Sequence, residues 1–203
     1  MKVALIGASG QAGSRILQEL TLRGHTVTAI ARHPEKIANL PGVTRLNGDA
    51  GDPAGLAALL KGHDVAISSV RFATSDHAAL TDAVKRSGVA RYLVVGGAGS
   101  LLSESGQLIV DSPGFPEGAR PEATKGLAFL NALRSETDLN WTFLSPAMRF
   151  IAGERTGKFR LGGDTMIRMA NGESWISFED YAIALVDEME TPAHARRRFT
   201  VGY

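Results

Sequence analysis

Residues 3–20 read VALIGASGQAGSRILQEL, and this stretch decides the fold because it joins a strand, a glycine loop and a helix without a break. Val3 to Ile6 form a short apolar run, which is typical of a buried strand. The residues after the loop repeat at helical spacing, at Ile16, Leu17 and Leu20. We therefore predict a strand-loop-helix unit at the start of the chain.

The loop GASGQAG, residues 7–13, carries glycines in the spacing GxxGxxG. In a dinucleotide-binding loop, the first glycine permits a tight turn, the second lets the backbone approach a pyrophosphate and the third lets the helix pack close to the sheet. The N–H groups of the helix N-terminus then face the phosphates, and Ser9 can add a hydroxyl. The loop predicts a nucleotide site, and the alternative is a plain tight turn.

The same alternation of strand and helix continues to residue 146. Further strands are expected at 26–31, 43–46, 65–70, 92–95 and 141–144, and helices at 34–40, 53–60, 77–87 and 121–135. Strands separated by helices indicate an α/β fold, a doubly wound parallel sheet with helices on both faces. The length of 203 residues favours a single domain over 1–203.

The rhythm changes after Pro146. Residues 159–161 and 166–169 resemble a small hairpin around Gly162-Gly163-Asp164. Ser177 and Asp180 fit a capping box at the start of a helix, and a last strand is expected over 198–201. We interpret 146–203 as a small C-terminal extension that forms a lid or wall on the substrate side.

Composition excludes several classes of function. The formal net charge is +1, so no global field recruits nucleic acid or an anionic membrane. The chain has no cysteine, which excludes disulfides and thiolate metal sites, and we expect no metal. No stretch reaches the roughly 20 apolar residues of a membrane helix. We expect a soluble cytoplasmic protein, either a monomer or a homodimer.

Arg32 lies where the second strand ends. In an open parallel sheet, ligands bind outside the carboxyl ends of the strands, and an NAD site usually has an acidic residue at this position. An arginine suits the 2′-phosphate of NADPH because its planar guanidinium binds phosphate through two hydrogen bonds. The sequence thus predicts NADPH over NADH, and the alternative is a solvated arginine.

Small and polar residues follow the other strands. Asp49, with Ala50, can accept a hydrogen bond from the adenine amino group, or it is a turn or helix-capping residue. Small residues at the next strand ends leave space for a flat ring system, and those expected at the cofactor are Ser68, Ser69, Gly96, Ser145, Pro146 and Ala147.

The segments GASGQAGSRI, ARHPEKI, YLVVGGAGSL and ISFEDYAIALVDEME together resemble the atypical short-chain dehydrogenase/reductases of the NAD(P)H-flavin reductase group. These are similar to NADPH-dependent flavin and biliverdin reductases and, more distantly, to NmrA-like nucleotide-sensing regulators. The resemblance spans essentially the whole chain and implies a Rossmann fold. It also implies that the pyrophosphate contacts Gly7, Ser9, Gly10, Gln11, Ala12 and Gly13, with Arg32 at the 2′-phosphate, Asp49 and Ala50 at the adenine, and Ser145 to Ala147 at the nicotinamide.

One departure from typical short-chain dehydrogenases concerns their catalytic Tyr-x-x-x-Lys pair. Lys125 is present, but Pro121 stands at the tyrosine position. A positioned acid contributes about a hundredfold to ten-thousandfold, so ordinary ketone reduction would be slow. Flavins and quinones accept hydride into a delocalised system and take the proton from solvent. The missing tyrosine therefore favours such an acceptor.

Four other residues are candidates: Ser100 and Lys125 for catalysis, and Arg149 and Arg155 for binding the substrate. A serine after the fifth strand is discussed as functional in the biliverdin reductase relatives; the matching residue here is Gly99, with Ser100 adjacent. Lys125 can bind ribose hydroxyls or lie on a solvated helix face. Arg149 and Arg155 can neutralise the phosphate of FMN, or they form surface ion pairs with Glu154 or Asp164.

The expected function is an NADPH-dependent oxidoreductase that transfers hydride to a flavin or quinone-like aromatic acceptor. The alternative is a non-catalytic NADP(H)-binding redox sensor of the NmrA-like type. The two differ in turnover, because a sensor binds both the oxidised and the reduced cofactor but does not oxidise NADPH with any small acceptor.

Overall fold

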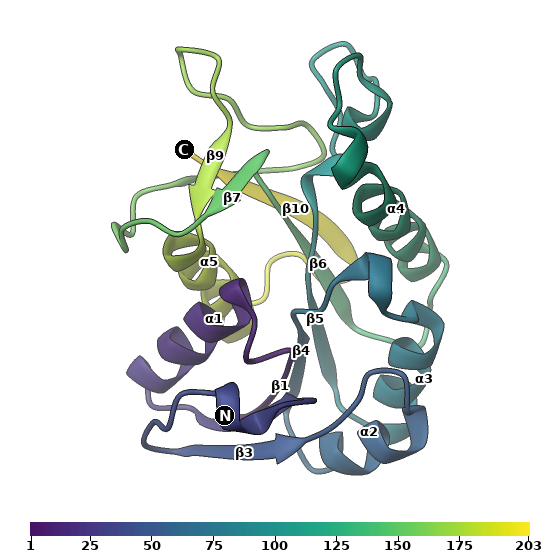
Figure 1. The fold of residues 1–203 in the computed structure, drawn as a ribbon, viewed down its shortest axis with the longest axis vertical. Helices are drawn as coiled ribbons and strands as arrows, with labels where there is room; N and C mark the ends of the chain where they lie inside the picture. Colours follow the sequence, from purple (N-terminus) through teal and green to yellow (C-terminus); the bar gives the residue numbers. More distant parts are fainter.

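The computed structural model describes residues 1–203 and contains one large twisted sheet between two layers of helices (Figure 1). The sheet has eight strands in the order β3-β2-β1-β4-β5-β6-β10-β8. All neighbours pair in parallel except β10 and β8. Their bounds are β1 Lys2–Ile6, β2 Thr26–Ala31, β3 Val43–Asn47, β4 Val65–Ser68, β5 Arg91–Val95, β6 Trp141–Pro146, β8 Arg160–Gly162 and β10 Arg197–Gly202.

Helices cover both faces of the sheet, which confirms the predicted doubly wound architecture. The long helices are α1 Gln11–Leu22, α2 Pro53–Leu60, α3 His77–Ser87, α4 Arg120–Arg134 and α5 Phe178–Glu190. In Figure 1, α1 and α5 lie on one side of the sheet, and α2, α3 and α4 lie on the other. The expected helix at 34–40 is only a 3-10 turn, η1 Pro34–Lys36, because Ile37 adopts an extended conformation and buries its side chain.

Strand alternation divides the apolar residues between two cores. On β1, Val3 and Leu5 join the core beneath α1 and α5, whereas Ala4 and Ile6 join the core beneath α2, α3 and α4. Successive side chains of a strand point to opposite faces, so a strand buried on both sides must be continuously apolar. This requirement explains the apolar run that precedes the glycine loop.

The strand order reverses direction between β1 and β4. Gly7, the first residue after β1, has a φ of +82°, and a Cβ on it would overlap the carbonyl oxygen of Ser69. Only glycine meets both conditions. The chain therefore leaves β1 in a tight turn at the switch point, where ligands bind in open parallel sheets.

The C-terminal segment differs from the predicted hairpin. β8 pairs with β10 in antiparallel register, with Thr200 opposite Gly162, and residues 166–169 form no strand. Met166 packs instead into a small cluster with Leu101, Ile109, Val110 and Phe115. The sequence pattern missed this arrangement because β8 finds its partner about 40 residues away rather than across a local turn.

A second sheet stands beside the first. It has two parallel strands, β7 Arg149–Ile151 and β9 Trp175–Ser177. The predicted helix cap at Ser177 is confirmed, since its Oγ accepts from the backbone N–H of Asp180 at 2.9 Å. The carboxylate of Asp180 does not complete the capping box; it accepts from the backbone N–H groups of Thr156 and Gly157 at 2.8 and 2.9 Å.

None of the helices combines the length and the apolar character needed to cross a membrane.

A buried ion pair ties α5 to the centre of the sheet. Arg91 on β5 donates to Glu188 on α5 at 2.8 Å, and both side chains are more than nine-tenths buried. Burial lowers the pKa of the Arg91 guanidinium, and the charge of Glu188 opposes this shift. Glu188 also accepts from the backbone N–H and the ring Nδ1 of His194. One carboxylate therefore satisfies donors from two distant parts of the chain.

We predict that Glu188→Ala lowers the free energy of unfolding by about 3–5 kcal/mol, because it leaves the charge of Arg91 buried without a partner. Glu190→Ala is the matched control. Glu190 pairs with Arg23 and His25 at the surface of the same helix, so its loss should cost about 0–1 kcal/mol. Urea unfolding of both variants measures the difference, and equal losses would contradict the assignment.

Candidate functional site

A polar cavity of about 240 Å³ lies at the carboxyl ends of the first four strands. The loops that follow β1, β2, β3 and β4 line it. Its polar lining includes Ser9, Arg32, Asp49, Ser69, Arg71, Thr74, Ser75 and Asp76, together with Gly7 and Gly10. The structure thus brings together the glycine loop and the residues at the ends of the second and third strands.

The glycine loop directs the start of α1 toward this cavity. The N–H of Gly10 donates to the carbonyl of Gly7 at 3.0 Å, and α1 begins at Gln11. No side chain caps the helix, so the first N–H groups are left for a ligand. A Cβ on Gly13 would overlap the carbonyl oxygen of Gly7, so only glycine lets the helix start this close to the turn. This geometry fits a bound phosphate.

Arg32, Asp49 and Ala50 all line the polar cavity. Arg32 is exposed and forms no ion pair. Asp49 Oδ1 accepts from the N–H of Gly51 at 2.8 Å, so Asp49 is a turn residue that also faces the cavity. The cap of α2 is Asp52.

Arg71 is a second arginine at this cavity, and it lies on the loop after β4. No motif in the sequence points to it, because the side chain of a residue in an irregular loop has no periodicity from which its direction can be predicted.

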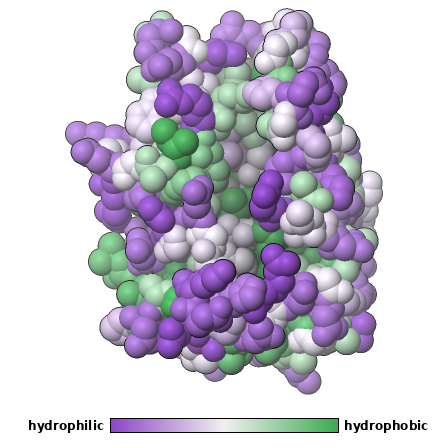
Figure 2. All heavy atoms as spheres, in the orientation of Figure 1, coloured by the Kyte–Doolittle hydropathy of each residue, from purple (hydrophilic) through white to green (hydrophobic).

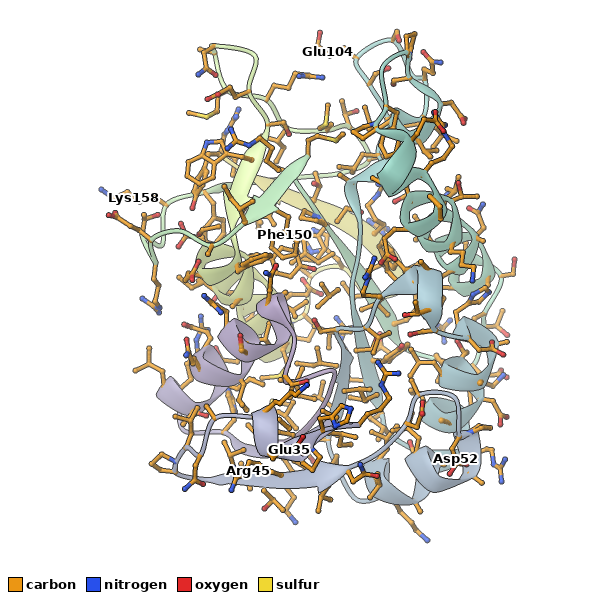
Figure 3. The ribbon with its side chains drawn as sticks, in the orientation of Figure 1. Glu35, Arg45, Asp52, Glu104, Phe150 and Lys158 are labelled. Atoms are coloured by element: carbon orange, nitrogen blue, oxygen red, sulfur yellow. The ribbon has the colours of Figure 1, made fainter.

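An apolar cavity of about 280 Å³ continues from the carboxyl ends of β5 and β6. Apolar groups line both of its sides, including Phe72, Phe115, Leu127, Met148 and Phe150. Figure 2 shows a hollow down the middle of this face, with pale and hydrophobic residues inside and more hydrophilic rims. Figure 3 places Phe150 near the middle of this face, on β7. The cavity suits an uncharged ring.

Small residues create the space in the apolar cavity. Gly96, Gly97 and Gly99 follow β5, while Ala123 and Gly126 line it from α4. A Cβ on Gly99 would overlap Ala123, and one on Gly126 would press on the ring of Phe72. The close approach of the β5 loop to α4 thus depends on these residues.

The predicted residues of the last strand ends fall into two groups. Gly96, Pro146 and Ala147 line the apolar cavity. The hydroxyls of Ser68 and Ser145 do not: Ser68 is buried and bonds to the hydroxyl of Tyr92 at 2.8 Å, and Ser145 Oγ is buried without a partner. The side chain of Ser68 is therefore corrected to a core residue, because strand alternation turns it away from the cleft.

The cavity holds no free proton donor among its side chains. Ser100 lines it, and its hydroxyl donates to the carbonyl of Gly97 at 3.3 Å. Tyr92 and Tyr181 are buried in the core, where burial raises the pKa of both phenols. Tyr203 bonds to Asp180 at 2.8 Å, and the ring of His77 stacks on Phe129.

Lys125 does not line the apolar cavity. Its Nζ donates to the carbonyl of Ala73 at 2.8 Å, on the far side of the turn η2 Phe72–Thr74. The single charged residue of the apolar lining is Glu122. Its two carboxylate oxygens accept from the N–H groups of Phe72 and Ala73, each at 2.7 Å. The sequence offers no signal for this role, because these contacts join residues about 50 positions apart.

The structure does not place Arg149 and Arg155 at the cavity. Arg155 donates to the buried Glu19 on α1 at 2.8 and 3.0 Å, and Arg149 lies 3.8 Å from Glu173. Neither pairs with Glu154 or Asp164 as expected. Asp164 is held by Arg198 of β10 instead. Neither side chain is part of the cavity lining, and the substrate-binding role of both stays a prediction.

A family described as NAD(P)H-binding matches residues 7–192, nearly the whole chain. The chain belongs to this NAD(P)H-binding family. The match includes the glycine loop and both cavities, and it agrees with the resemblance seen in the sequence.

Relatives extend over the full length. The uncharacterized protein YwnB of Bacillus subtilis is 40% identical over 209 residues, which cover 99% of this chain and 98% of that protein. A solved structure from Bacteroides thetaiotaomicron, provisionally described as an epimerase, is 41% identical with a TM-score of 0.94, and covers 100% of this chain and 96% of its own. One from Streptococcus pneumoniae, provisionally described as an NADH-flavin reductase, is 37% identical with a TM-score of 0.87 and covers 100% and 99%. The NAD(P)H-binding family and these neighbours indicate an oxidoreductase.

We predict that Gly13→Ala weakens NAD(P)H binding about tenfold or more, a loss of at least about 1.4 kcal/mol, because the new methyl group forces α1 away from the glycine turn. Gly118→Ala is the control, since a Cβ there meets nothing. Fluorescence titration of the reduced cofactor measures both affinities. Unchanged affinity in Gly13→Ala would show that the close helix start is not needed for binding.

Proposed function

We propose that this protein is an NADPH-dependent reductase that transfers hydride to a flavin or quinone-like aromatic acceptor. The observation that carries the proposal is the pair of cavities along one sheet edge. The polar cavity fits the adenosine and phosphate half of the cofactor, and the apolar cavity fits the nicotinamide and a second ring.

The nicotinamide is proposed to lie against Pro146 and Ala147, at the end of β6. The acceptor then fills the part of the cavity between Phe115 and Phe150. When bound, NADPH supplies the hydride. The chain holds the nicotinamide and the acceptor ring next to each other, and the apolar walls of the cavity exclude water. Such orientation alone is worth about 7–11 kcal/mol of a reaction barrier.

The lack of a free acid supports this class of acceptor. Reduction of an isolated carbonyl needs a proton at the oxygen as the hydride arrives, and a positioned acid supplies about a hundredfold to ten-thousandfold. A flavin or quinone spreads the added charge over its ring system and is protonated by solvent afterwards. The lining, with no lysine, arginine, histidine or tyrosine, matches that chemistry.

NADPH is proposed over NADH because Arg32 faces the polar cavity with its guanidinium unpaired. A structure of similar fold, a short-chain dehydrogenase/reductase of Veillonella parvula with a TM-score of 0.79, contains NADP. At 19% identity it supports the fold, and the choice of cofactor rests on Arg32.

The direct experiment mixes the protein with NADPH and either FMN or menadione and follows the absorbance of the reduced nicotinamide. We expect NADPH to be oxidised faster than in enzyme-free mixtures with at least one acceptor. Tight binding of NADPH without oxidation by either would contradict a reductase and support an NADP(H)-binding redox sensor.

We predict that Arg32→Ala weakens NADPH binding about tenfold and leaves NADH binding nearly unchanged, because the 2′-phosphate loses a charge-assisted pair of hydrogen bonds. Arg45→Ala is the matched control. Arg45 lies nearby on β3, donates to the carbonyl of Ile37 and does not line the cavity. An unchanged ratio of the two affinities in Arg32→Ala would overturn the assignment.

A further inference from the structure

We infer that Glu122 and Lys125 are positioning residues that together hold the turn Phe72–Thr74, which lies between the polar cavity and the apolar cavity. This inference rests on the proposed function for its kinetic consequences. We call the turn and its flanking residues, 71–76, the partition loop.

Both side chains extend from α4 and form hydrogen bonds with the backbone of the same turn. Glu122 accepts from the N–H groups of Phe72 and Ala73 at 2.7 Å each, and Lys125 donates to the carbonyl of Ala73 at 2.8 Å. Positions three apart on a helix lie on one face, so both reach the turn together. Hydrogen bonds to charged groups are stronger than neutral ones, which makes this a firm attachment.

The partition loop contributes to both cavities. Phe72 is buried and lines the apolar cavity, and its ring also packs against Phe129 and Phe143 in the core. Arg71, Thr74, Ser75 and Asp76 line the polar cavity. A shift of this loop would therefore change the place of the cofactor and of the acceptor at once.

The contacts of Glu122 and Lys125 favour a positioning role over a role in proton transfer. Both oxygens of Glu122 already accept hydrogen bonds from backbone N–H groups of the turn, so the carboxyl group is directed at the turn. Lys125 is tied to a carbonyl, and Pro121 leaves it without the tyrosine that it would assist in a conventional reductase. Neither group is free to donate a proton to an acceptor in the apolar cavity.

The partition loop carries its own reporter, because Arg71 is exposed and trypsin cleaves after arginine. We expect Glu122→Gln and Lys125→Met each to speed cleavage after Arg71 about tenfold, whereas cleavage after the exposed Lys158 stays unchanged. Glu117→Gln is the matched control, because it is the same substitution at an exposed residue that pairs with Arg120 near the start of α4 and does not contact the turn. Mass spectrometry of the early fragments assigns each cut.

The kinetic prediction is a loss of kcat about tenfold in both variants, with a smaller change in the KM for NADPH, because the glycine loop still binds the phosphates. Lys125→Arg should restore most of the activity, since a guanidinium can donate to the same carbonyl. The pH profile of kcat should keep its shape in Glu122→Gln.

Three outcomes separate the possibilities. Unchanged cleavage after Arg71 in both variants overturns the inference, even if activity falls. Loss of an ionisation from the pH profile in Glu122→Gln also overturns it, because Glu122 would then transfer a proton. If cleavage after Arg71 is faster in the variants but no acceptor supports oxidation of NADPH, the result supports the role of Glu122 and Lys125 in holding the turn and contradicts the proposed reductase.

Discussion

The structure depends on the close approach of two backbone segments at the switch point of the sheet. Gly7 turns out of β1 directly against the carbonyl of Ser69, and Gly13 starts α1 directly against the carbonyl of Gly7. Neither contact tolerates a side chain. Because β1 lies between β2 and β4, this one turn opens the cleft and points the first N–H groups of α1 into it. The polar cavity follows from these two contacts.

The apolar cavity depends on a second set of close contacts, between the β5 loop and α4. Small residues on both sides, Gly99 and Ala123 among them, bring the two segments together and leave a slot beside them. The C-terminal extension supplies the opposite wall through Phe150. An apolar cavity without a free proton donor can orient the ring of an acceptor, but it cannot activate a substrate carbonyl by protonation. The chemistry we propose is therefore mainly a matter of position.

Much of the fold could be predicted from the sequence because its determinants are local. The apolar strands, the GxxGxxG loop and the Ser177 cap each act within a few residues, and all were found where the pattern indicated. The predictions failed where distant segments decide. β8 pairs with β10 instead of a neighbour, Arg155 finds Glu19 on α1, and Glu122 binds the turn at Phe72. No local spacing contains that information.

In the proposed reaction, hydride passes directly from the nicotinamide to an acceptor without help from a protein acid. The most direct measurement is the rate of hydride transfer in a single turnover, with NADPH deuterated at the transferred position, across the pH range in which the protein is folded. We expect deuterium to slow the step and its rate to show no ionisation of a protein group. A rate that falls as pH rises through one ionisation, and that loses this dependence when a single side chain is replaced, would contradict this expectation.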